Sequence, residues 1–180
     1  MIYLTSDLHL CHNRPFLYEP RGYSSIYQMN EDIVSNWNSI VDTTDEVYVL
    51  GDLMLNDNDA GIKFLKQLKG DIHIIRGNHD TDSRIELYNQ CYNVVEVCNS
   101  TYLKCNGFHF YLSHYPTLTS TFDIEKRLCS RLINLCGHTH TSDPFLDWDR
   151  YNAPIYHCEL DAHHNAPVSI DQIIFEIRNH

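Results

Sequence analysis

Short apolar runs alternate with amphipathic stretches along the chain, which is the pattern of an α/β fold. Eight runs are predicted to be strands, at residues 1–6, 46–50, 71–76, 94–97, 101–104, 108–113, 131–136 and 155–160. Asn106-Gly107 is a strong turn signal, so the two runs on either side of it are expected to form a hairpin. Several of the other runs end abruptly at a polar residue.

Helices are predicted where apolar residues recur at helical spacing. Ile33, Val34, Trp37 and Ile40 share one face of a helix over residues 30–41, with Asn30 as its cap. Further helices are expected at residues 59–68, 83–90 and 123–131, and residues 170–177 are a short helix or strand. Residues 10–28, rich in Pro, Arg, Tyr and Ser, are expected to form a long irregular loop. No linker or repeat interrupts the chain, which predicts one domain over residues 1–180.

Composition narrows the class of protein. The 180 residues carry a formal charge of −11 with twelve histidines, and such an acidic chain is poorly suited to long duplex nucleic acid. No apolar run approaches the roughly 20 residues needed to cross a bilayer, and we expect no membrane partner and no signal peptide. The seven cysteines form no CxxC pair, so reduced thiols in a cytoplasmic protein are favoured over a cysteine-held zinc.

The strongest signal is a set of metal-ligand residues that directly follow predicted strands. They are Asp7, His9, Asp52, Asn78, His79, Asp80, His114, His138 and His140. Because carboxyl ends of neighbouring strands open into one crevice, we expect these side chains to meet. Any one of them alone is more typical of a turn, a cap or a strand end. Their joint occurrence favours a site, whereas His73 and His109, inside strands, are expected to be structural.

Mixed imidazole and carboxylate ligands suit Mn, Fe or Zn rather than Ca. Two such ions about 3.5–4 Å apart clamp the attacking and leaving oxygens of an in-line phosphoryl displacement. The pair needs a bridging carboxylate, for which Asp52 is the natural candidate. A hydroxide shared by the ions is the expected nucleophile, and a nearby histidine can protonate the leaving group.

The order and spacing of five motifs resemble the signature of calcineurin-like metallophosphoesterases. These motifs are Asp7-Leu8-His9, Gly51-Asp52, Gly77-Asn78-His79-Asp80, His114 and Gly137-His138-Thr139-His140. The resemblance implies a four-layer αββα sandwich, here without a cap, and two divalent ions. Mn²⁺ is favoured, with Fe, Zn, Ni or Mg as alternatives. It implies that Asp7, His9, Asp52 and His140 hold one ion and that Asp52, Asn78, His114 and His138 hold the other. His79 would be the catalytic acid, with Asp80 orienting its ring.

Differences between this sequence and the larger members of the family indicate which branch it resembles. No arginine follows Gly51-Asp52 at the position where protein phosphatases carry one, and lipid A precursor hydrolases usually have Arg in place of His79. The extended first motif through His12 and the Asn165–Ile173 stretch resemble a small bacterial and phage branch of predicted phosphoesterases.

For the substrate we consider His12, Arg14 and Arg21, all in the 10–28 loop, as phosphate contacts. Tyr18, Tyr23 and Tyr27 in the same loop are a possible stacking wall for a base. The leading hypothesis is a phosphodiesterase acting on a small phosphoester, nucleotide-like substrates included. The alternatives are a phosphomonoesterase, a nuclease for short single strands and a non-catalytic metal-binding scaffold. The sequence leaves the oligomeric state open.

Overall fold

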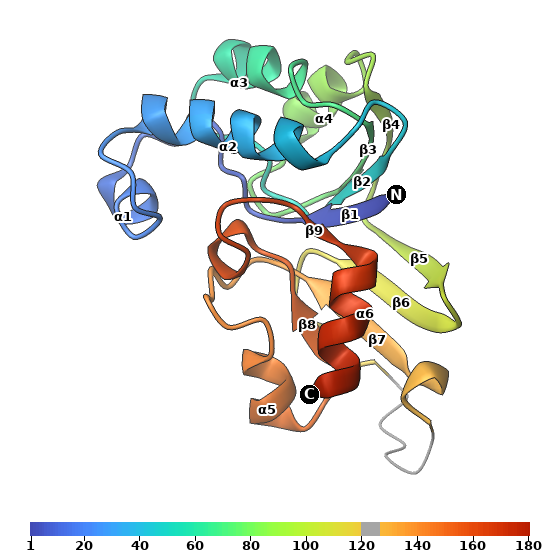
Figure 1. Ribbon diagram of the computed structural model, residues 1–180. Coiled ribbons are helices and arrows are strands. Elements are labelled where there is room, and N and C mark those ends of the chain that lie inside the picture. The colour runs from blue at the N-terminus through green and yellow to red at the C-terminus, as the bar shows by residue number, and fades with distance from the viewer. Residues whose placement is uncertain (120–126) are drawn as a thin grey trace.

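Two β-sheets with helices beside them make up the protein (Figure 1). This computed structural model describes residues 1–119 and 127–180. The first sheet has the strand order β4-β3-β2-β1-β9. Its strands are β1 (Ile2–Thr5), β2 (Glu46–Val49), β3 (Asp71–Ile75), β4 (Val94–Cys98) and β9 (Val168–Ser169). Strands β1 to β4 run parallel, and β9 pairs antiparallel with β1.

The second sheet has the order β5-β6-β7-β8. Its strands are β5 (Ser100–Cys105), β6 (Phe108–Ser113), β7 (Leu132–Cys136) and β8 (Ile155–His157). Strands β5 and β6 form the predicted antiparallel hairpin, and β6, β7 and β8 run parallel. Both sheets therefore contain neighbouring parallel strands, whose carboxyl ends lie together.

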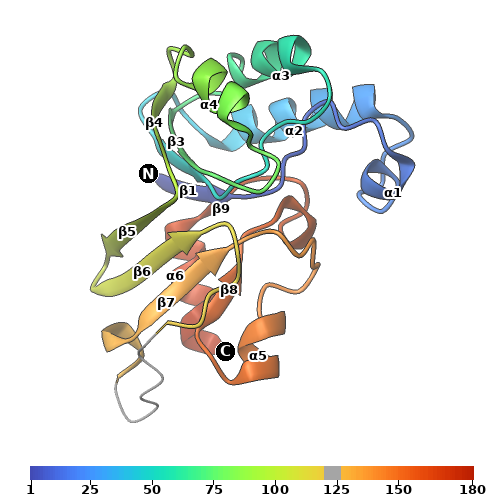
Figure 2. The same cartoon turned by 180° about the vertical axis from the view of Figure 1, so that it is seen from behind.

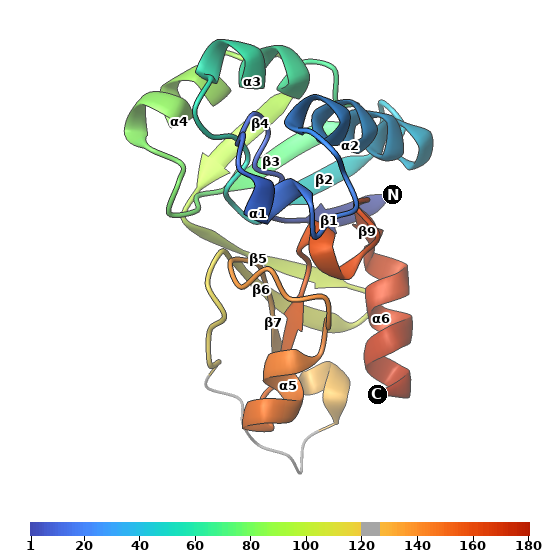
Figure 3. The same ribbon diagram turned by 90° about the vertical axis from the view of Figure 1, so that its left-hand side faces the viewer.

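The helices flank the sheets. Figures 1 and 3 show α2 (Ile26–Ile40), α3 (Asn58–Leu65) and α4 (Asp82–Tyr88) along the first sheet. On the other side lie α5 (Leu146–Tyr151) and α6 (Ile170–Asn179), beside the second sheet (Figure 2). Three single turns complete the described elements: α1 (Pro15–Tyr18), η1 (Leu128–Ser130) and η2 (Leu160–Ala162).

Alternation along the strands of the first sheet separates two apolar clusters. Val47 and Val49 pack with the residues under α2, α3 and α4, whereas Tyr48 and Leu50 belong to the cluster shared with the second sheet. Helix α6 adds its isoleucines to that second cluster. Two sheets flanked by helices confirm the predicted α/β fold.

Local differences from the prediction have physical causes. Helix α2 starts after Ser25, whose hydroxyl accepts the amide hydrogen of Gln28 at 3.2 Å, so the Asn30 cap was wrong. Asn30 is instead buried in the helix, and its side chain accepts a bond from the Cys11 amide at 3.0 Å. The expected loop 10–28 contains α1, and α5 was not predicted. Of the helix expected at 123–131, residues 123–126 lie outside the described residues and 128–130 form the turn η1.

None of the helices in the described part of the chain is both long and apolar enough to span a membrane. The six cysteines whose side chains the structure describes are all free thiols, and four of them are buried.

Candidate metal centre

The predicted ligand residues all follow strands whose carboxyl ends meet where the two sheets adjoin. Asp7 and His9 come after β1, Asp52 after β2, Asn78 after β3, His114 after β6, and His138 and His140 after β7. The loops are bonded to one another: the Asp7 amide donates to Gly51 O at 3.0 Å, and the Gly137 amide donates to His114 O at 2.9 Å. The two sheets thus place the loops side by side through backbone contacts.

Five of the seven predicted ligands adopt left-handed backbone, which residues other than glycine seldom do. Their φ angles are +56° at Asp7, +49° at His9, +55° at Asp52, +79° at His138 and +52° at His140. Such strained conformations gather at functional sites, where the surrounding structure holds them.

Glycines at two of the motifs permit the loops to touch. A Cβ on Gly77 would overlap the Asp52 carboxylate, and one on Gly137 would overlap the side chains of Ser6 and Asp7. Both glycines therefore lie directly against a neighbouring ligand loop, where a side chain would not fit.

The first group of ligands surrounds Asp7. His9 Nε2 and His140 Nε2 each lie 3.7 Å from Asp7 Oδ1, and these two nitrogens are 3.1 Å apart. Asp7 is fully buried, and its Oδ1 has no hydrogen-bond partner in the described structure. An orphaned buried carboxylate oxygen facing two imidazole nitrogens is the arrangement that a cation satisfies.

The second group lies around His114. His114 Nε2 is 2.8 Å from Asn78 Oδ1 and 3.2 Å from His138 Nδ1. Its other nitrogen, Nδ1, lies 2.8 Å from the carbonyl oxygen of Leu50. A bond donated from Nδ1 leaves Nε2 with a free lone pair, the form in which histidine binds a metal.

Asp52 connects the two groups. Its Oδ2 lies 3.8 Å from His9 Nε2 and 3.6 Å from His114 Nε2, while Oδ1 accepts the His79 amide hydrogen at 2.8 Å. One carboxylate oxygen therefore faces both groups.

The spacing of the paired histidine nitrogens fits ligation of a divalent ion. Ligand atoms about 2.0–2.2 Å from one ion lie roughly 3.0–3.5 Å apart, as the paired histidine nitrogens do. Within each group, imidazole nitrogens are combined with carboxylate or amide oxygens.

The pKa shifts of Asp7 and Asp52 are consistent with a cation bound at these residues. Burial opposes ionisation of Asp7, but the His9, His140 and His114 rings outweigh it and lower the pKa of its carboxyl to about 2. Burial raises the pKa of Asp52, so a cation on either side would favour its charged form.

We predicted that Asp80 orients the His79 ring, but in the structure its carboxylate binds other groups. Its Oδ2 accepts the amide hydrogens of Asp52 at 2.8 Å and Gly77 at 2.9 Å, and its Oδ1 accepts the Tyr88 hydroxyl at 2.8 Å. The carboxylate is buried, and its bonds connect the loop of Asp52 with the loop of Gly77. The His79 side chain is 43% exposed, and its Nε2 lies 4.0 Å from Asp52 Oδ2.

Arg21 is also placed differently from the prediction. Its buried guanidinium pairs with Asp161 at 2.7 Å and donates to the carbonyl oxygen of Asp7 at 2.8 Å, so it braces the first motif from behind. These bonds occupy the guanidinium, although Arg21 also lines the cavity beside His140. Arg14 is exposed just before α1.

His12 remains close to the ligands. Its ring centroid is 5.5 Å from that of His9 and 6.4 Å from that of His79. Burial, aided by the charges of His9 and His79, lowers the pKa of His12 to about 4, which keeps its ring neutral at neutral pH.

Two acidic residues that sequence reasoning missed support the last motif. Asp161 Oδ2 lies 3.1 Å from His140 Nδ1, which turns His140 Nε2 toward Asp7. Glu159 Oε1 accepts bonds from the Thr139 amide at 3.2 Å and the Thr139 hydroxyl at 3.0 Å.

Behind Glu159 lies a fully buried histidine. His157 bonds to Glu159 at 3.0 Å and to Asp147 at 3.1 Å. Burial opposes protonation of His157, but the two carboxylates outweigh it and raise its pKa. The sequence offered only a weak signal: Glu159 lies at the end of the last predicted strand and Asp161 directly after it.

Comparisons with known proteins identify the family. The model of the calcineurin-like phosphoesterase superfamily domain matches residues 1–153. An uncharacterized protein of Methanocaldococcus jannaschii is 31% identical over 179 residues, covering 96% of this chain and 89% of the relative. The chain therefore belongs to the calcineurin-like phosphoesterase superfamily.

The fold is shared with a solved structure. A protein of unknown function from Aquifex aeolicus superposes with a TM-score of 0.74 at 21% identity, over 97% of both chains. A structure described as an archaeal phosphodiesterase matches with a TM-score of 0.49 at 16% identity, over 87% of this chain and 81% of its own.

Proposed function

We propose that the protein is a phosphodiesterase that uses two divalent ions, Mn²⁺ above all, to hydrolyse a small phosphodiester. Asp7, His9, Asp52 and His140 would hold one ion, and Asp52, Asn78, His114 and His138 the other. The observation that carries the proposal is Asp52 Oδ2, which faces His9 at 3.8 Å and His114 at 3.6 Å. Its family supports phosphoester chemistry. Free, buried cysteines support a reducing compartment, and we propose the cytoplasm.

When bound, two ions supply the positive charge that activates a water and stabilises the phosphoryl oxygens. The protein's own residues then have separate tasks. His79, beside Asp52 and half open to solvent, would donate a proton to the leaving oxygen. Asp80 and Asp161 hold the loops and the His140 ring, so that the ligands are already in place.

A diester is favoured over a monoester by the surroundings of the ligands. One cavity, of about 580 Å³, is lined in part by Asn78 and His114. Another, of about 430 Å³, is lined in part by His140. A phosphodiester has two substituents to accommodate, and a cavity lies beside each ligand group.

The substrate class is tested with Mn²⁺-loaded protein. We expect a higher kcat/KM on bis-p-nitrophenyl phosphate than on p-nitrophenyl phosphate, and loss of both activities in excess chelator with recovery when Mn²⁺ is restored. A clear preference for the monoester would contradict the proposed order. Absence of turnover on both esters by fully metal-loaded protein would refute the proposal itself.

Because the Asp161 carboxylate orients the His140 ring, a substitution of Asp161 tests the metal position that His140 would hold. Asp161→Asn removes the carboxylate that orients the ring, and we expect affinity for the ion held by His140 to fall about 10- to 100-fold. Competition with a chromogenic chelator measures the two affinities separately. Asp149→Asn, at an exposed carboxylate on α5, is the control and should change neither. Equal weakening at both positions would mean that Asp161 acts on the whole fold, through Arg21, rather than on His140.

A further inference from the structure

The cavity beside the second ligand group has the features of a substrate pocket. Its volume is about 580 Å³, within the roughly 300–1,000 Å³ of small-molecule sites. Asn78 and His114 are part of its wall, so the cavity begins at the proposed metal position itself. A group attached to the reacting phosphate can enter it without crossing another part of the protein.

The wall of this cavity is aromatic and polar. None of the residues that line it in the described chain is aliphatic. Tyr111 and Tyr115 contribute rings, and Tyr115 is 50% exposed. The Tyr115 ring packs edge-on against His114 at 5.0 Å and His138 at 4.7 Å, which fixes it at the rim of the ligand group. A wall of this kind suits a planar polar ring and does not suit an alkyl chain.

Polar groups complete the wall. Asn99 is exposed there, and a side-chain amide both donates and accepts, as the edge of a nucleobase does. Arg76 pairs at 2.8 Å with Asp82, a carboxylate that is 86% exposed. Such a surface pair contributes little, so the guanidinium can turn to a ligand at small cost.

We propose that this cavity binds the base of a nucleoside whose sugar is esterified to the reacting phosphate, with Tyr115 as the stacking ring. The substrates would then be nucleoside phosphodiesters. This inference rests on the proposed function and names its substrate class. It moves base recognition away from the tyrosines of residues 10–28, because none of them lines this cavity.

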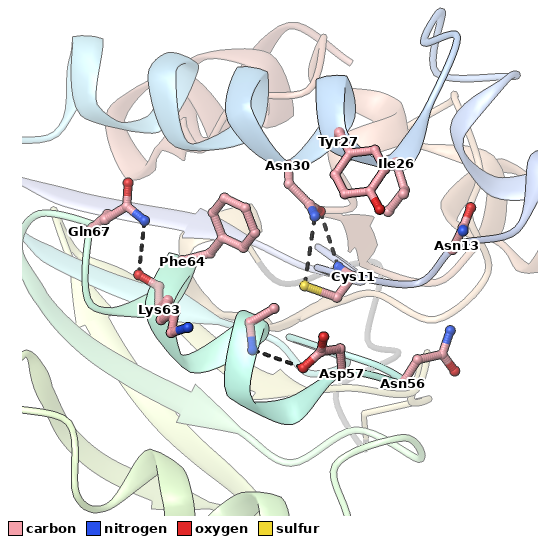
Figure 4. A pocket seen from close by; sticks show the side chains of 11 residues that line it. Cys11, Asn13, Ile26, Tyr27, Asn30, Asn56, Asp57, Lys63, Phe64 and Gln67 are labelled. Carbon is pink, nitrogen blue, oxygen red and sulfur yellow. Dashed lines mark hydrogen bonds between the residues drawn. The ribbon is translucent and has the colours of Figure 1, made fainter.

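A second cavity, between α2 and α3, is the natural comparison. It measures about 550 Å³, and Figure 4 shows the Tyr27 ring below α2 and the Phe64 ring above α3. The amide of Asn30 in its wall is already bonded to Cys11. No proposed metal ligand lines this cavity. Its exposed Tyr27 therefore serves as a matched control for Tyr115.

Two chromogenic diesters with the same leaving group test the proposal. Thymidine 5′-p-nitrophenyl phosphate carries a base, and ethyl p-nitrophenyl phosphate does not. We expect the wild type to prefer the thymidine ester, and Tyr115→Ala to lower that preference by roughly 5- to 150-fold, the range for loss of one stacking ring. Tyr115→Phe should keep most of it, and Tyr27→Ala should leave it within about twofold. Metal content is measured for every variant.

The outcomes separate this inference from the proposed function. An unchanged preference in metal-loaded Tyr115→Ala, or a loss in Tyr27→Ala instead, would overturn the base pocket while both esters are still hydrolysed. If the wild type hydrolyses neither ester, the proposed function fails, and the pocket is judged by binding. Thymidine 5′-monophosphate should then shift the NMR signals of the Asn99 side-chain amide in the wild type and not in Tyr115→Ala. Absence of that shift in the wild type would refute the pocket.

Discussion

Asp52→Asn is expected to lose metal at both positions and to lower kcat/KM by about 10³-fold or more. The substitution removes a negative charge that faces both ligand groups. Metal charge contributes several kcal/mol to phosphoryl transfer, and each 1.36 kcal/mol is a factor of ten in rate. Asparagine keeps an oxygen that can still accept the His79 amide hydrogen, so the loop itself should remain folded. Elemental analysis after desalting gives the metal content, and steady-state kinetics gives the rate.

The matched control is Asp59→Asn, at an exposed residue in the first turn of α3. It should retain both ions and full activity. Full occupancy of one position in Asp52→Asn, with the other empty, would show that Asp52 is a ligand of a single ion. Retention of both ions with normal kcat/KM would contradict its place in the centre.

The residues brought together in the centre could be predicted because they lie on regular elements. Each motif directly follows a strand, and parallel strands align their carboxyl ends, so order along the chain implied proximity in space. Asp7 beside His140 and Asn78 beside His114 follow from this rule. Most of the strands were likewise readable from the apolar pattern, and the hairpin from its Asn-Gly turn.

The residues that hold the metal ligands in place could not be predicted in this way, since their positions depend on contacts between residues distant in sequence. Arg21 is buried because Asp161, 140 residues later, meets its guanidinium. An arginine in a polar loop gives no sign of such a partner, and exposure is its ordinary state. Glu159 and His157 were missed for the same reason.

Asp80 shows a different limit. Its neighbour His79 made it the apparent partner of that ring, but the backbone turns the carboxylate inward to the amides of Asp52 and Gly77. Adjacency in sequence does not fix side-chain direction in a turn. The left-handed backbone of Asp7, His9 and Asp52 was equally beyond prediction, because tertiary contacts alone sustain it.

His79→Ala is expected to lower kcat about 10²- to 10⁴-fold while both ions remain bound, since this histidine would act as the general acid and not as a ligand. Alanine retains the backbone amide that donates to Asp52 Oδ1 at 2.8 Å, so the bridging carboxylate should stay in place. A proton donor matters most for a basic leaving group. The loss of kcat should therefore be larger for an alkyl diester than for a p-nitrophenyl diester.

His109→Ala serves as the control, because that histidine lies on β6 against Tyr102 and not beside the ligands. It should change neither the metal content nor the ratio of the two rates. Loss of an ion in His79→Ala would make His79 a ligand and overturn its catalytic role. An equal fall in kcat for both leaving groups, with the ions retained, would mean that His79 stabilises charge on the phosphoryl group without donating a proton. The dependence on the leaving group thus decides which task the half-exposed ring performs.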